Sequence, residues 1–205
     1  NQKKQLAKIR GKIASMVFQD SMTSFDPLFT VGYQIVETIL THKDTNKEEA
    51  FKEALQLLKK VEIQNPEKVI NYYPHQLSGG MLQRAMIAMA LSCEPKLLIA
   101  DEPTTALDVT VQAQILQLIK DLQLEKNMSL IMITHDLGVI AETVDRVIVM
   151  YGGQIMENSN VYEIFDQPKH PYTKALIDSI PGQEPGKRKL KEITQIERDS
   201  WYASL

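Results

Sequence analysis

The sequence is poor in cysteine, in net charge and in long apolar runs, and each shortage excludes a class of protein. Cys93 is the only cysteine among 205 residues, so no disulfide framework can form within the chain and a reducing compartment is expected. The 23 basic and 26 acidic side chains leave a net charge of −3, which lacks the basic excess of a nucleic-acid-binding domain. The longest uninterrupted apolar run, residues 85–91, is far shorter than a membrane span.

A complete phosphate-binding loop of the pattern G-x-x-x-x-G-K-[ST] is also absent from these residues. The glycine–lysine pair at 11–12 continues into Ile13, and the pair at 186–187 continues into Arg188. Neither pair is followed by the serine or threonine that this loop requires. The remaining composition, 43% hydrophobic, is that of one ordinary globular domain with room for a sub-domain.

The most informative stretch of the sequence, residues 77–108, holds two chemical devices joined by a helix. The first is the polar turn Leu77–Met81, in which Ser78, Gly79 and Gly80 precede an apolar-periodic helix. Adjacent glycines let a ligand approach the backbone closely, and the free N–H groups of a helix N-terminus attract an anion. The turn therefore indicates a phosphate site, although a plain serine–glycine helix cap is the alternative for this turn by itself.

The second device is the apolar run 97–100, which is followed by Asp101 and Glu102. Such a run is typical of a buried parallel strand, and the carboxyl ends of such strands form the ligand-binding edge of an open α/β sheet. One carboxylate suits Mg²⁺, and the next suits the orientation of an attacking water. A strand that merely happens to end in two acids is the alternative.

Three further polar residues are predicted to lie directly after a strand or in the turn that follows one. Gln19 ends a predicted strand over 12–18, Asp108 closes the turn after the two acids, and His135 follows a predicted strand over 128–133. A neutral imidazole can hydrogen-bond a phosphate and the water near it, so His135 is a candidate switch. Any one of these residues by itself would be given a structural role, but their combination favours a shared site.

Three segments carry a resemblance to a known family: YPHQLSGGM at 73–81, ADEPTTALDVT at 100–110 and HPYTK at 170–174. Over about residues 6–180 the chain resembles the ATP-binding cassette (ABC) ATPases. Within them it is most similar to the ATPase subunits of bacterial oligopeptide, dipeptide and nickel importers. The resemblance implies an α/β fold, with a RecA-like parallel sheet of the P-loop NTPase type and an inserted helical sub-domain.

The resemblance also implies roles for the residues at the strand ends, with ATP and Mg²⁺ as cofactors. Asp101 would bind Mg²⁺, with Gln19 touching the same region and reporting site occupancy to the membrane partner. Glu102 would polarise the water that attacks the γ-phosphate. His135 would sense that phosphate.

The same resemblance implies a head-to-tail dimer of two such subunits, identical or paralogous. Ser78, Gly79 and Gly80 would complete the ATP site of the opposite subunit, and Asp108 would couple the two sites. The subunit would lie peripherally on the cytoplasmic face of the membrane and power integral-membrane permease subunits. An extracytoplasmic substrate-binding protein would be an indirect partner, and no nucleic acid is expected.

The expected organisation has four parts. They are a RecA-like part over 1–23 ending in the Q-loop, a helical sub-domain with the signature motif over 24–94, a RecA-like part with Walker B, D-loop and switch histidine over 95–158, and C-terminal helices with a polar tail over 159–205. Many peptide importers carry an iron–sulfur cysteine cluster in the last part, and the cysteine count excludes it here.

In the family the phosphate loop and an adenine-stacking aromatic precede the segment that begins at Asn1. We therefore interpret the chain as an N-terminally truncated subunit, expected to be inactive alone. The phosphate-loop strand of RecA-like sheets lies between the strands predicted over 128–133 and 145–151, and both would lose a neighbour. Four apolar side chains on these strands are then expected to be exposed, namely Ile131, Ile133, Ile148 and Val149.

Two other function classes remain open at this point. A catalytically incomplete binding module could supply the signature motif in trans to a partner's phosphate loop. A soluble ABC ATPase of DNA repair or translation is the other, and the HPYTK segment argues against it. The transported substrate, whether oligopeptide, dipeptide or nickel, is not predicted, because specificity lies in the permease and its binding protein.

Overall fold

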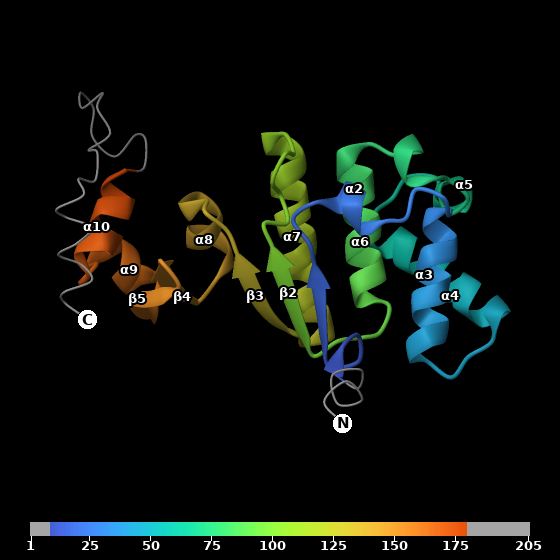
Figure 1. The fold of residues 1–205 in the computed structure, drawn as a ribbon, viewed down its shortest axis with the longest axis horizontal. Helices are drawn as coiled ribbons and strands as arrows, with labels where there is room; N and C mark the ends of the chain where they lie inside the picture. Colours follow the sequence, from blue (N-terminus) through green and yellow to red (C-terminus); the bar gives the residue numbers. More distant parts are fainter. Residues whose placement is uncertain (1–8, 180–205) are drawn as a thin grey trace. The chain divides into compact units, whose positions relative to one another are not determined.

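The computed structural model describes residues 9–179, and the chain divides into two compact units between Thr134 and His135 (Figure 1). The predicted polar tail from Pro181 onward lies outside the described residues. Within residues 9–179, no helix is both long enough and apolar enough to cross a membrane.

The first unit is built on a parallel sheet with the strand order β1-β2-β3. The strands are β1 (Ala14–Val17), β2 (Leu97–Asp101) and β3 (Ser129–Ile133). Val17 is paired with Ala100, and Asp101 with Ile133, so the carboxyl ends of the strands meet at one edge of the sheet. The prediction of a parallel strand that delivers acidic residues to this edge is confirmed.

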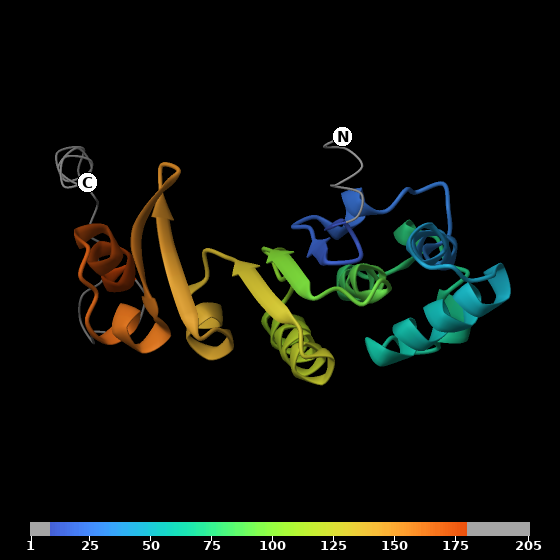
Figure 2. The same cartoon turned by 90° about the horizontal axis from the view of Figure 1, so that it is seen from below.

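Helix α7 (Val109–Lys126) connects β2 to β3 and lies along one face of the sheet (Figure 2). It buries four residues at helical spacing, as the sequence predicts: Ile115, Leu118, Ile119 and Leu122. Asn127 ends the helix in the left-handed conformation, with φ 48°. This reversal directs the chain toward β3. Helix α7 thus provides the long crossover connection that two parallel strands need, because a tight turn cannot join them.

A group of helices is inserted between β1 and β2 (Figure 1). They are α2 (Ser21–Ser24), α3 (Val31–His42), α4 (Lys47–Lys60), α5 (Pro66–Val69), the 3₁₀ helix η1 (Pro74–Gln76) and α6 (Gly79–Leu91). The predicted apolar face of α3 is buried, and it shares one core cluster with Leu98 of β2 and Ile115 of α7. The inserted helices and the sheet are therefore packed around a common core.

Both contacts of the predicted capping box are found at the start of α4. The Asn46 side chain accepts a hydrogen bond from the Glu49 N–H, as expected for an N-cap. The Glu49 carboxylate accepts a hydrogen bond from the Thr45 hydroxyl at 2.8 Å. This bond and the one from the Asn46 backbone N–H lower the pKa of Glu49, so a neighbouring hydroxyl adds to the reciprocal bond of the box.

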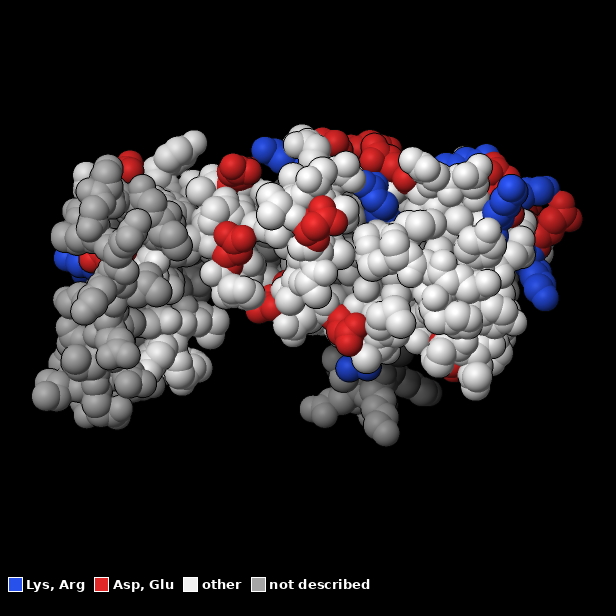
Figure 3. All heavy atoms as spheres, turned by 90° about the horizontal axis from the view of Figure 1, so that it is seen from above, with Lys and Arg blue, Asp and Glu red and all other residues white. Residues whose placement is uncertain are grey.

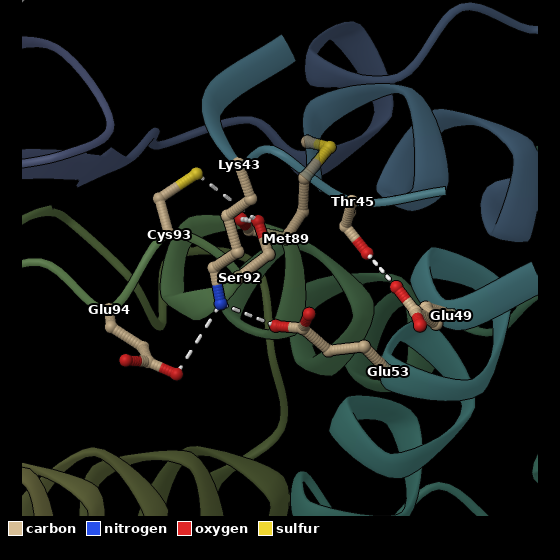
Figure 4. Close-up of polar contacts among 8 residues, drawn as sticks. All are labelled: Lys43, Thr45, Glu49, Glu53, Met89, Ser92, Cys93 and Glu94. Atoms are coloured by element: carbon tan, nitrogen blue, oxygen red, sulfur yellow. Dashed lines mark hydrogen bonds and ion pairs between the residues drawn. The ribbon is translucent and has the colours of Figure 1, made fainter. Parts of the chain in front are cut away.

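Lys43 ties the inserted helices to the segment that enters β2 (Figure 4). From the end of α3 its Nζ donates to Glu53 on α4 at 2.7 Å and to Glu94 at 3.4 Å. Beside this cluster Cys93 is buried, with its Sγ 3.7 Å from the Ser92 hydroxyl oxygen. Burial raises the pKa of the Cys93 thiol, which agrees with the predicted role of a plain buried thiol.

Over residues 135–179, the described part of the second unit, the chain forms an antiparallel hairpin and three short helices. The elements are α8 (Leu137–Thr143), β4 (Arg146–Tyr151), β5 (Gln154–Asn160), α9 (Val161–Asp166) and α10 (Pro171–Asp178). The predicted glycine turn is confirmed, because Gly152 and Gly153 join β4 to β5 with φ values of 55° and 81°. The core of the second unit contains Val147, Val149, Met156, Val161, Ile164 and Ile177.

The expectation of four exposed apolar residues is correct for three of them. Ile131 and Ile133 on β3 and Ile148 on β4 are 49%, 47% and 55% exposed, but Val149 is only 7% exposed. The prediction for Val149 is wrong, because successive side chains of a strand point to opposite faces. Val149 therefore joins the core of the second unit, and Met150 takes the exposed position.

Candidate functional site

The carboxylate of Glu102 lies just beyond the end of β2 and is held by two side chains. Its Oε2 accepts hydrogen bonds from Gln19 Nε2 at 2.7 Å and from Thr105 Oγ1 at 2.9 Å. The Glu102 N–H donates to the Ile133 carbonyl oxygen at 2.8 Å, which extends the pairing with β3 by one residue. Gln19 and Thr105 thus fix the carboxylate, and Ile133 fixes the backbone of Glu102 at the sheet edge.

The backbone of Glu102 is left-handed, with φ 45°, and Ala106 four residues later has φ 67°. A glutamate seldom adopts this conformation, which is retained only where the surrounding contacts enforce it. The turn after β2 is therefore held in a defined shape. Figure 3 views the molecule from the side toward which the three strands point, and acidic side chains are exposed on that face.

Asp101 is the last residue of β2 and directly precedes Glu102 in the sequence. Its side chain is partly buried. Within residues 9–179, no group of three or more His, Cys, Asp or Glu side chains is placed to hold a metal ion. This donor set fits Mg²⁺, which is commonly bound by one or two protein carboxylates and completes its octahedron with waters and substrate phosphates. Asp101 is the residue that would supply a protein ligand, and Gln19, whose amide nitrogen donates to Glu102, carries an oxygen that would serve as a second ligand.

The polar turn before α6 forms a regular helix cap. Ser78 is the N-cap, and its hydroxyl accepts a hydrogen bond from the Met81 N–H at 3.3 Å. Ser78 and Gly79 are exposed. The amino end of a 13-residue helix is thus presented to solvent with an exposed serine and glycine, which is the arrangement that attracts an anion.

The two glycines of this turn are required for different reasons. A Cβ on Gly80 would lie 2.7 Å from Cγ1 of Val111 on α7, so Gly80 permits the close approach of two helices. A Cβ on Gly79 would meet only Leu107 Cδ2, at an ordinary 3.6 Å. Packing within this unit therefore explains the glycine at position 80 but leaves the one at position 79 free to serve a ligand or partner.

Asp108 is the N-cap of α7, and residues close to it in the sequence contact the turn before α6. Its carboxylate accepts a hydrogen bond from the Val111 N–H at 3.0 Å. Since Leu107 and Val111 are the residues that face Gly79 and Gly80, the structure brings the turn before α6 together with the turn before α7. Sequence analysis assigned both turns to a site but did not predict their contact.

His135 belongs to the second unit, at its first residue, and is exposed. Asp136 caps α8 by accepting hydrogen bonds from the N–H groups of Gly138 and Val139, at 2.9 and 3.3 Å. His135 is thus held at the amino end of α8 within its own unit. The role of His135 at the phosphate stays a prediction.

Sequence analysis missed two residues of this region. Thr105 holds the Glu102 carboxylate, and a hydroxyl three residues after the acid, inside a turn, was a usable signal. Arg84 is buried on α6 and reaches two other helices. An arginine within the apolar run of a helix was the available signal, because a buried guanidinium requires several hydrogen-bond acceptors.

Comparison with known families gives two matches. The family described as "ABC transporter" matches residues 1–105, and the one described as "Oligopeptide/dipeptide transporter, C-terminal region" matches residues 156–200. The chain is 55% identical to a dipeptide transport ATP-binding protein of Haemophilus influenzae, over 91% of this chain and 56% of that protein. It is 58% identical to an oligopeptide transport ATP-binding protein of Bacillus subtilis, over 85% of this chain and 53% of that protein.

Among solved structures, the chain is similar to a dimeric ATP-binding cassette in a post-hydrolysis state bound to ADP and Pi. The TM-score is 0.67 at 33% identity, and the alignment covers 77% of this chain and 67% of that one. The chain spans about half the length of the curated relatives named above. The parallel sheet with inserted helices is consistent with the RecA-like fold of the P-loop NTPases.

Proposed function

Because the chain belongs to the ABC transporter family, we propose that the full-length protein is the ATP-hydrolysing subunit of an importer of peptides. The observation that carries the proposal is the carboxylate of Glu102, held at the carboxyl edge of a parallel sheet by Gln19 and Thr105. The match of residues 156–200 to the C-terminal region of oligopeptide and dipeptide transporters supports a peptide as substrate class over nickel.

In the proposed reaction Glu102 orients the water that attacks the γ-phosphate of ATP. Its left-handed backbone and its hydrogen bonds from Gln19 and Thr105 hold the carboxylate in place before substrate arrives, so little reorganisation remains. Asp101 and the Gln19 amide oxygen would hold Mg²⁺, which when bound would neutralise charge on the phosphates. His135 is proposed to sense the γ-phosphate.

Ser78, Gly79 and Gly80 are proposed to act on the nucleotide of a second ABC subunit. The exposed cap of α6 supports this role, as does the absence of a packing reason for glycine at position 79. Asp108 lies in the adjoining turn and couples the two sites across the subunit interface. The partner is a second copy of the protein or a paralogue.

The permease is proposed to dock on the helical part of the chain. Leu28 is 77% exposed, and the rings of Phe29 and Tyr33 stack with centroids 4.9 Å apart on the exposed side of the loop and of α3. Such an apolar, aromatic surface is typical of a protein interface. The subunit then works peripherally at the cytoplasmic face of the membrane, and the substrate-binding protein acts on the far side.

We also propose that the four-part organisation described for the sequence applies to the working subunit. The parts are residues 1–23, 24–94, 95–158 and 159–205. The shared core of the inserted helices and the sheet supports a close mechanical link between the described residues of the first two parts and residues 95–134 of the third. A link of this kind lets Gln19, at the end of β1, report the state of the nucleotide to the inserted helices.

The proposal is tested with Glu102→Gln in the full-length protein. Wild type is expected to hydrolyse ATP, and the variant to lose about 100-fold or more in rate while keeping its ATP affinity, because a water-orienting group is lost and the phosphate contacts are not. Phosphate release and calorimetric ATP titration measure the two quantities. Glu48→Gln is the matched control, since Glu48 is 79% exposed on α4. Turnover of Glu102→Gln within a few-fold of wild type would falsify the assignment.

A further inference from the structure

Arg84 is a buried cation with three hydrogen-bond acceptors. It lies on α6, one turn after Gly80, and is only 9% exposed. Nη1 donates to the carbonyl oxygen of Val61 at 2.9 Å and to the Glu62 carboxylate at 3.1 Å, and Nη2 donates to Gln114 Oε1 at 3.3 Å. Because a buried guanidinium is unfavourable without such partners, these bonds define where α6 can lie.

The three acceptors contribute in different ways. The Glu62 side chain is 72% exposed, so water screens its ion pair with Arg84 strongly. Val61 is the C-cap of α4, where the last carbonyl groups of a helix carry partial negative charge and lack helical partners. Gln114 lies on α7. Arg84 therefore supplies a hydrogen-bond donor to the carboxyl end of α4. Because Arg84 lies on α6, its bonds connect α6 to both α4 and α7.

A second contact joins α6 to α7 one turn earlier, where Gly80 meets Val111. Gly80 and Arg84 are four residues apart on α6, and Val111 and Gln114 are three apart on α7, so each pair shares one helix face. The contacts form two successive rungs between the same two helices. Each helix begins with a turn of the proposed site, capped by Ser78 on α6 and by Asp108 on α7.

We propose that Arg84 is a positioning residue that fixes the signature turn, Ser78–Gly80, relative to the turn that ends at Asp108. The inference rests on the proposed function, in which the first turn acts on the partner subunit's nucleotide and the second couples the two sites at the same interface. Two turns that must meet one interface need a set spacing, and misplacement by about 1 Å can reduce a rate by orders of magnitude. Arg84 itself touches neither turn and acts through Gln114 on α7 and Val61 on α4.

The test removes the hydrogen bond from Arg84 to α7 with the substitution Gln114→Leu in the full-length protein. Gln114 is exposed, and leucine is a good helix former, so the fold is retained. The matched control is Gln117→Leu, the same change one turn along α7, where the amide bonds only Asp121 in the same helix. Gln114→Glu is the rescue variant, because a carboxylate at this position still accepts from Arg84.

Gln114→Leu is expected to lower the maximal rate of ATP hydrolysis roughly tenfold with an unchanged KM for ATP. Gln117→Leu and Gln114→Glu should stay within about twofold of wild type. Equal rates for the two leucine variants would overturn the inference, as would a loss of ATP affinity that accounts for the loss of rate.

Hydrogen exchange supplies a readout that does not depend on turnover. The Met81 and Val111 amides, which Ser78 and Asp108 cap, should exchange faster in Gln114→Leu than in Gln117→Leu. A wild-type protein that does not hydrolyse ATP contradicts the proposed function, and the exchange comparison then still decides the role of Arg84. Equal protection of these amides in both variants would overturn it.

Discussion

At the scale of single residues, the site depends on a few side chains whose backbone conformation is unusual or whose size is constrained. Glu102 combines a left-handed backbone with two side-chain donors, and Gly80 allows α6 to approach Val111. Gly79 differs, because no close contact inside its unit requires a glycine there. The two neighbouring glycines of this motif thus have separate physical roles.

Alanine substitutions at the two glycines should therefore give opposite results. Gly80→Ala should destabilise the protein by about 1 to 3 kcal/mol, because its Cβ would overlap Val111. Gly79→Ala should change stability by less than about 0.5 kcal/mol and yet reduce ATP-driven dimerisation and turnover. Urea denaturation measures the first effect, and light scattering with ATP measures the second.

The outcome for Gly79 can also contradict the proposed dimer. A Gly79→Ala protein that dimerises and hydrolyses ATP as wild type does would remove the reason for placing this turn against a partner's nucleotide. A tenfold loss of ATP affinity in the monomer would instead place the turn at the nucleotide of its own subunit.

At the scale of elements, helix ends decide where the chain turns, and α10 is the clearest case. The Glu157 carboxylate on β5 accepts hydrogen bonds from two successive N–H groups, those of Lys169 at 2.9 Å and His170 at 3.0 Å. His170 in turn caps α10, where its Nδ1 accepts from the Tyr172 N–H at 3.1 Å. The HPYTK segment is thus a helix start that is anchored to a strand.

This anchor predicts a pH dependence. Burial by itself raises the pKa of Glu157, but the Lys169 N–H, the Thr173 side chain, the His170 N–H and the His170 ring together lower it more, and the pKa lies below its ordinary value. The stabilisation is therefore fully present above the ordinary carboxyl pKa of about 4.3 and is lost as the pH falls through the lowered value.

Glu157→Gln should cost about 1 kcal/mol at pH 7, a figure reduced because the group is partly exposed to solvent. The difference in unfolding free energy between the variant and wild type should shrink toward zero near pH 3. Denaturation curves at several pH values check this, with Glu37→Gln on α3 as a control at an exposed carboxylate. A difference that stays constant from pH 7 to 3 would contradict the anchor.

At the scale of the whole molecule, the sheet of the first unit has an exposed apolar strand. Within residues 9–179, β3 is paired only with β2, and Ile131 and Ile133 remain about half exposed. Unpaired, apolar strand edges favour pairing with another chain. No glycine–lysine pair of residues 1–205 continues into a phosphate loop.

Residues 1–205 produced as an isolated chain should therefore not bind Mg-ATP in the micromolar range and should not behave as a stable monomer. Isothermal calorimetry and sedimentation test the two statements, and the full-length protein is the positive control. Micromolar binding of Mg-ATP to the isolated chain, or cooperative melting of a well-behaved monomer, would refute this expectation.

The sequence by itself determined the parallel strand that ends at Asp101, the amphipathic helix after Asp108 and the glycine turn of the hairpin. Local signals were enough for these elements, because an apolar run, a 3.6-residue period and paired glycines each have a direct physical meaning. Motif order was enough for the family. The candidate site residues were also named from the sequence, and their roles remain predictions.

Only the tertiary structure decided which distant residues meet. The bond from Gln19 to Glu102 spans 83 positions, and the approach of Gly80 to Val111 depends on the packing of two helices. The roles of Thr105 and Arg84 follow from the same contacts. Long-range packing chooses among many partners that local patterns allow equally, which is why the arrangement of the site could not be derived from residue spacing.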